Sequence, residues 1–194
     1  MLWKKNYILT LKTFSLFSTR MTWGSGSGMQ MIAATKKDDD YDSLFIIKEG
    51  HGLDACPTGT SIKCGSVVRL EHVNTGKNIH SHQYPSFVTE SQEVCGFGEN
   101  GIGDLNDNWE LQCYNSKDSI VKGETQFFLL HEATRNYLYV NIRKSLYNDV
   151  NCRNCPIRGH REVSCTTSKD KQALWKIKGG LIFNAIEEEN KNQQ

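Results

Sequence analysis

The chain has 194 residues, a length that fits one ordinary domain. Its 23 Lys and Arg residues face 22 Asp and Glu residues, and the formal net charge of +1 argues against a nucleic-acid surface or a polyacidic partner, since each needs a field of one sign. No run reaches the ~18 apolar residues of a membrane span. Sixteen Gly and three Pro favour many tight turns, so the composition predicts a turn-rich β domain.

Residues 1–15 carry two conflicting signals. Lys4 and Lys5 precede an apolar stretch, as in a secretory signal, but Lys12 interrupts it and no small-x-small cleavage pattern follows before Arg20. We therefore expect either a degenerate signal or a first strand here. The folded domain is predicted to cover residues 16–184, followed by a polar tail over 185–194.

The sequence contains three similar units. Three segments begin with an aromatic residue followed by alternating apolar positions, at Phe45, Trp109 and Trp175, with spacings of 64 and 66 residues. A shift of 58 aligns Lys77-Asn78 with Arg135-Asn136. In the middle of the units, Gln30-Met31-Ile32, Gln92-Glu93-Val94 and Arg161-Glu162-Val163 align. The units are predicted at about 1–55, 60–115 and 119–184.

Each unit consists of short alternating stretches separated by Gly, Asn, Asp or Ser, a pattern typical of strands. One unit alone buries only one side of a hairpin pair. Three units can share a core around a pseudo-threefold axis and close their strand edges against one another. We therefore predict an all-β protein with a β-trefoil fold, in which Phe45, Trp109 and Trp175 lie in the core.

Seven cysteines in this length indicate an oxidising compartment or a metal site. Cys56 and Cys64 flank the short turn Pro57–Thr60 and are candidates for a disulfide between adjoining strands. Cys152 and Cys155 form a CxxC pair. No helix follows it that would lower a thiol pKa, so a disulfide, unpaired thiols and a metal site all stay open.

The candidate ligand- or partner-binding residues are His80, His82, Tyr84 and Asp104. His80 and His82 lie on one face of a predicted strand. They can hydrogen-bond within the fold, contact a partner or hold a metal, and the metal needs a third ligand such as His72 or Asp104 to converge. Tyr84 and Trp109 can stack on a sugar ring, although the repeat position of Trp109 favours the core, and Asp104 or Asn106 can accept hydrogen bonds from the sugar hydroxyl groups. We predict no metal.

Catalytic motifs are absent from the sequence. It contains no GxSxG, GxxxxGK[ST] or HExxH pattern. The sequence therefore predicts a protein that is not an enzyme and that needs no cofactor.

The segment from Gly65 to His82 resembles the MIR repeat, which is shared by protein O-mannosyltransferases, inositol-trisphosphate and ryanodine receptors, and stromal cell-derived factor 2. The fuller resemblance is to the stromal cell-derived factor 2 family. It runs from about Leu16 to about Phe183. Further matching segments are Gly24–Gly28, Ile62–Gly65, Gln92–Val94, Phe97–Glu99, Gly103–Trp109 and Trp175-Lys176. The first repeat is degenerate, with Leu16-Phe17-Ser18-Thr19 where the family has Leu-His-Ser-His.

This resemblance implies a three-repeat β-trefoil of the endoplasmic reticulum lumen without catalytic activity. It implies a place in protein quality control, beside a J-domain co-chaperone and the lumenal heat-shock-70-class chaperone. We expect a secretory-pathway recognition module that binds these chaperones or client polypeptides. The alternative is a glycan-binding trefoil linked to protein O-mannosylation.

Overall fold

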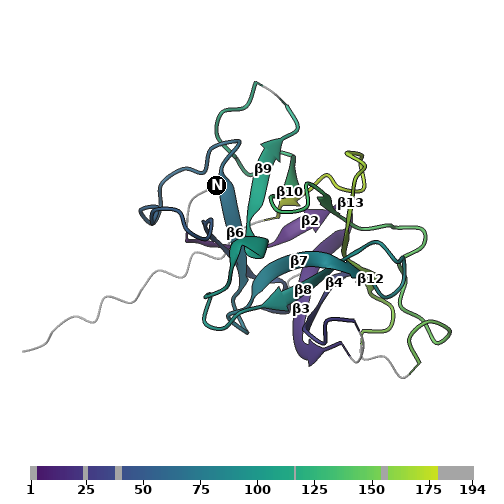
Figure 1. Cartoon of the computed structure of the whole chain (residues 1–194). Coiled ribbons are helices and arrows are strands. Elements are labelled where there is room, and N and C mark those ends of the chain that lie inside the picture. Colours follow the sequence, from purple (N-terminus) through teal and green to yellow (C-terminus); the bar gives the residue numbers. More distant parts are fainter. Residues whose placement is uncertain (1–3, 24–25, 38–40, 116, 154–156, 179–194) are drawn as a thin grey trace, which may run out of the picture.

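The computed structural model describes residues 4–23, 26–37, 41–115, 117–153 and 157–178. Within them the chain forms fourteen strands and two short 3-10 turns (Figure 1). The elements are β1 (Asn6–Tyr7), β2 (Leu9–Leu11), β3 (Phe14–Thr22), β4 (Gln30–Thr35), η1 (Tyr41–Ser43), β5 (Phe45–Glu49), β6 (Val67–His72), β7 (Asn78–Pro85), β8 (Gln92–Phe97), η2 (Leu105–Asp107), β9 (Trp109–Cys113), β10 (Phe127–His131), β11 (Tyr137–Tyr139), β12 (Arg161–Glu162), β13 (Ser164–Thr166) and β14 (Lys176–Ile177). In the described residues, neither 3-10 turn is long enough to span a membrane.

The first and last strands of the three units close a barrel. Antiparallel pairing runs from β1 to β5, then through β6 and β9 to β10. Phe127 bridges to Trp175, just before β14, and β14 pairs with β2. Because β1 and β2 follow each other with only Ile8 between them, the ring closes and leaves no open sheet edge in the barrel.

The inner strands of each unit form hairpins that cap one end of the barrel. These hairpins are β3–β4, β7–β8 and β11–β13. They are joined to one another by the pairs β4–β8, β8–β13 and β12–β4. Figure 1 shows β3, β4, β7 and β8 crossing below β6 and β9. A six-stranded barrel capped by three hairpins is the predicted β-trefoil.

The three repeat-related aromatic residues lie together in the core. Phe45, Trp109 and Trp175 are fully buried in one hydrophobic cluster. Trp109 Nε1 donates to the Ile79 carbonyl at 2.9 Å, and Trp175 Nε1 makes the same bond to Leu138 at 2.8 Å. A buried indole N–H needs such an acceptor, and in the second and third repeats the fold supplies it from the second strand of the repeat.

The structure corrects one detail of the predicted repeat alignment. Leu138 occupies the position of Ile79, and His131 the position of His72, so the shift between these repeats is 59 residues rather than 58. Asn78 therefore corresponds to Tyr137 and not to Asn136, which is the same residue type one position earlier. The shared turn fixes this register, because its penultimate residues Gly76 and Arg135 both adopt positive φ, 65° and 56°.

Of the two alternatives for the N-terminal segment, the structure shows a first strand. Leu9 and Leu11 of β2 are fully buried, and the strand pairs with both β3 and β14. The sequence pattern did not decide between a strand and a signal because Lys12 interrupts the apolar run. Lys12 has φ 56° in the tight turn between β2 and β3. The predicted tail over 185–194 lies outside the described residues.

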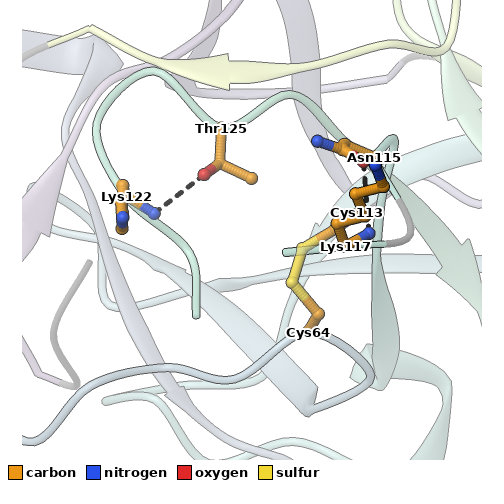
Figure 2. Close-up of a disulfide and its surroundings, with 6 residues drawn as sticks. All are labelled: Cys64, Cys113, Asn115, Lys117, Lys122 and Thr125. Carbon is orange, nitrogen blue, oxygen red and sulfur yellow. Dashed lines mark hydrogen bonds between the residues drawn. A yellow bond between two sulfur atoms is a disulfide. The ribbon is translucent and has the colours of Figure 1, made fainter. Parts of the chain in front are cut away.

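The predicted bridge between Cys56 and Cys64 is wrong. Cys64 is bonded to Cys113, which lies 49 residues away with a Cα–Cα distance of 5.5 Å (Figure 2), and Cys56 is a free thiol. Gly65 N–H donates to the Leu111 carbonyl at 2.7 Å, and this bond lays Cys64 beside the end of β9 instead of beside its sequence neighbour. Cys152 is disulfide-bonded, and Cys155, its predicted partner, lies outside the described residues.

Candidate functional site

Strand β7 places His80, His82 and Tyr84 in a row on one face, as strand alternation predicts. The rings of His80 and His82 have centroids 5.3 Å apart, and those of His82 and Tyr84 lie 4.9 Å apart. His80 is buried, whereas Tyr84 is 53% exposed. The row, which we call the β7 row, thus leads from the interior to the surface.

His80 is fixed by a buried carboxylate. Its Nδ1 lies 2.9 Å from Asp107 Oδ1 and 3.6 Å from Asp104 Oδ1. Asp107 is fully buried and also accepts from Asn78 Nδ2 at 3.1 Å and from the Asp104 N–H at 2.9 Å. A buried carboxylate with three donors is well compensated for its lost hydration. This arrangement gives the inner end of the row a rigid base.

The loop before η2 fits tightly around this base. A Cβ on Gly103 would lie 1.7 Å from Asp107 Oδ2, so only glycine lets the loop approach the carboxylate. The loop leaves its apolar side chains outside: Ile102 is 73% exposed and Leu105 is 63% exposed. Asp104 lies between them and caps η2 by accepting from the Asn106 N–H.

His82 faces a different acidic residue. Its Nε2 lies 2.5 Å from Oε2 of Glu93, which is buried on the neighbouring strand β8. Two positions further along β8, the Cys95 thiol lies 3.3 Å from the Met29 Sδ atom and donates to it. Burial, with a smaller effect of Glu93, raises the pKa of the Cys95 thiol, so it is protonated at neutral pH.

A shallow pocket of about 510 Å³ opens beside the outer end of the β7 row. The ring of Trp23 stacks on Phe87 with a centroid distance of 6.0 Å. The pocket is lined by Trp23, Gly26, Pro85, Ser86, Phe87, Glu90 and Glu93. It combines aromatic rings with carboxylates.

The structure brings the four predicted site residues into one chain of contacts, from Asp104 through the β7 row to Tyr84. His72 does not converge on them, because its Nδ1 bonds Thr75 Oγ1 and its Nε2 bonds the Asp42 carbonyl. Sequence reasoning missed Glu93 and Asp107, the carboxylates that hold the two histidines. The alternation of β8 indicates the face on which Glu93 lies, but its pairing with His82 depends on the β7–β8 register. We call the exposed side of this assembly the β7 surface, which consists of His82, Tyr84, Ile102, Asp104 and Leu105.

Comparisons with known proteins agree with the repeat pattern. The family model described as MIR domain matches residues 20–178. A stromal cell-derived factor 2-like protein of Dictyostelium discoideum is 37% identical over 174 residues, covering 88% of this chain and 77% of the relative. Stromal cell-derived factor 2 of Homo sapiens is 35% identical over 172 residues, which cover 89% of this chain and 76% of the human protein. The crystal structure of the SDF2-like protein from Arabidopsis thaliana has a TM-score of 0.83 at 26% identity, and covers 96% of this chain and 99% of that one.

The barrel, its three hairpins and the recurring tryptophan bonds define a β-trefoil built from three MIR repeats. The chain belongs to the MIR-domain family and, within it, to the stromal cell-derived factor 2 family.

Proposed function

We propose that this protein is a non-catalytic recognition module of the endoplasmic reticulum lumen or the secretory pathway, and that its β7 surface binds a polypeptide. The observation that carries the proposal is the exposure of Tyr84, Ile102 and Leu105 around the rigid base of His80 and Asp107. Exposed aromatic and aliphatic side chains on a rigid support are typical of binding hot spots. The expected partners are a lumenal J-domain co-chaperone with the heat-shock-70-class chaperone, or client polypeptides.

The cysteines support an oxidising compartment. The Cys64–Cys113 bond joins segments 49 residues apart and packs against the core, as a structural bridge does. Structural bridges of this kind are rare in reducing compartments. Membership in the stromal cell-derived factor 2 family supports the same location, since the family resemblance implies a lumenal protein.

A pull-down from lumenal extract tests this function. The wild-type chain is expected to recover a J-domain or heat-shock-70-class protein, and a Tyr84→Ala/Leu105→Ala variant is expected to lose it. Tyr114→Ala is the matched control, because Tyr114 is 62% exposed and directly follows β9, outside the β7 surface. Failure of the wild type to recover either class counts against the proposal, as does equal recovery by the double variant.

Glycan binding is the second candidate, favoured by the pocket beside Tyr84. The Trp23 and Phe87 rings can stack on a sugar, and Glu90 and Glu93 can accept from its hydroxyl groups. Trp109 has no part in such a site because it is fully buried. Saturable mannose or galactose binding on a glycan array, lost in Phe87→Ala, selects glycan binding over the first function. A link to O-mannosylation is the role that we would then expect.

The non-catalytic part of the proposal has its own test. The geometry supports it because the His80 and Asp107 side chains are both buried and therefore do not reach a substrate at the surface. Turnover of any glycan or peptide substrate that disappears in His80→Ala or Asp104→Asn would contradict it.

A further inference from the structure

The side chains around His82 form a compact group of unlike donor atoms. His82 Nε2, Glu93 Oε2 and Cys95 Sγ all lie within 4.8 Å of one another. They are an imidazole nitrogen, a carboxylate oxygen and a sulfur, which are the three kinds of atom that bind Zn²⁺ in proteins. Zn²⁺ bonds of roughly 2.0–2.3 Å place neighbouring ligand atoms roughly 3.3–3.8 Å apart, so small side-chain adjustments suffice.

The geometry points to a zinc site in which His82 Nε2, Glu93 Oε2 and Cys95 Sγ hold the ion, with a fourth position open to water. This site goes beyond the partner surface and does not depend on it. Zn²⁺ binding displaces the Cys95 thiol proton to solvent as the Zn–S bond forms. Three protein ligands and one open position are the arrangement that zinc adopts where it meets a further ligand.

The charge of the donor set favours a divalent cation. One thiolate and one carboxylate balance the two positive charges of Zn²⁺, and the imidazole stays neutral. A neutral complex costs least in a partly buried position, where Glu93 and Cys95 are buried and the His82 side chain is 15% exposed. Cu⁺ would leave one negative charge uncompensated, and Mg²⁺ or Ca²⁺ prefers oxygen ligands alone.

The surrounding segment is shaped to accept these groups. Ser27 lies beside the Cys95 sulfur, while burial raises the pKa of this thiol overall. Gly26 lies against Glu93, since a Cβ on it would be 3.0 Å from Glu93 Oε1. Gly26 and Ser27, which precede β4, thus lie beside the carboxylate and the thiol. Outer contacts of this kind orient metal ligands.

The donor set occurs in one repeat of three. In the first repeat, the equivalent positions hold Thr19, Met31 and Ala33, since Ser18 and Ser81 make matching bonds to the third strand. In the third repeat, Glu162 keeps the carboxylate, but Ser164 replaces the cysteine. A group that served only the trefoil fold would be expected to recur with the repeats. This one does not.

Zinc content and cobalt absorption of the folded chain test the site. After equilibration with zinc and dialysis, we expect one zinc ion per chain by mass spectrometry. Co²⁺ used as a probe should give a thiolate-to-cobalt charge-transfer band. Cys95→Ser should abolish this band, whereas Cys56→Ser, which removes another free thiol, should leave it. Asp104→Asn tests the neighbouring group of His80, Asp104 and Asp107 and should also leave it.

If Cys95→Ser does not fold, His82→Gln and Glu93→Gln provide the same test through zinc affinity, which should fall by at least about tenfold. Zinc that is not retained by the wild-type chain would overturn the site. So would retention that is unchanged in His82→Gln, or a cobalt band that depends on Cys56 instead of Cys95.

Discussion

Gln92 of the second repeat donates its amide hydrogen to Thr134 Oγ1 of the third repeat at 2.8 Å. Thr134 in turn bonds His131 Nδ1, whose Nε2–H donates to the Asn106 carbonyl. The same three residue types recur one repeat earlier, in Gln30, Thr75 and His72, with the Asp42 carbonyl at the end. These two relays join neighbouring repeats through polar groups at the rim of the core.

The relays predict losses of stability at two distant positions. Gln30→Ala removes bonds to Ser18 and Thr75, and Gln92→Ala removes the equivalent bonds to Ser81 and Thr134 together with the bond that its Oε1 accepts from Asn136. Each variant should lower the free energy of unfolding by about 1–3 kcal/mol, because buried partners lose their bonds. Urea unfolding measures this. Gln126→Ala, at an exposed position, should change it by less than about 0.5 kcal/mol.

The relays also predict a loss of stability in mild acid. Burial lowers the pKa of His72 and of His131 below the ordinary 6.5. This effect outweighs the hydrogen bonds to the Asp42 and Asn106 carbonyls, which act to raise the pKa. The unfolded chain therefore binds protons that the folded chain excludes, and stability falls as pH drops from about 6.5 through the lowered pKa values. Unfolding at about pH 7.5 and about pH 5.5 should show this loss. A His72→Gln/His131→Gln variant should lose less on acidification; an identical pH dependence would contradict the assignment.

The disulfide is expected to contribute strongly to stability. It closes a loop between residues 49 positions apart, for which loop entropy gives about 4 kcal/mol. A Cys64→Ser/Cys113→Ser variant should therefore unfold at clearly lower denaturant concentration. Cys56→Ser should match the wild type, because Cys56 is a free thiol. A Cys56→Ser variant that is destabilised as much as the double variant would instead support the Cys56–Cys64 pairing that the structure contradicts.

The base of the β7 row depends on one glycine. Gly103→Ala should lower the free energy of unfolding by about 1–3 kcal/mol, because the added methyl group meets the Asp107 carboxylate. It should also displace His80, which is visible as a changed imidazole resonance in NMR spectra. Gly123→Ala is the control, since a Cβ there meets no atom within 4 Å. Equal stability of both variants would show that the loop does not pack against Asp107.

The sequence patterns predicted the trefoil because hydrophobic periodicity and repeat spacing both report burial. Phe45, Trp109 and Trp175 could be placed in the core on spacing alone. The register between repeats two and three was missed by one residue, since matching Asn78 to an identical residue type ignored the turn geometry that fixes strand pairing. The Cys64 partner was missed because proximity in the chain says little about which strand end lies opposite.

The candidate site was predictable in part for a similar reason. His80, His82 and Tyr84 alternate along one strand, so their common face follows from the local pattern. Glu93 and Cys95 lie on the next strand, and their pairing with His82 depends on the β7–β8 register, which shifts between Ser81 and Pro85. No single-strand pattern contains that information.

NMR mapping of partner binding tests the proposed role of the β7 surface most directly. Isotope-labelled protein would be titrated with a purified lumenal J-domain co-chaperone. The proposal predicts saturable resonance shifts concentrated at Tyr84, Ile102 and Leu105, with Tyr114 unchanged. Shifts confined to Tyr114 and the far end of the barrel, or no shifts at any partner concentration, would contradict it.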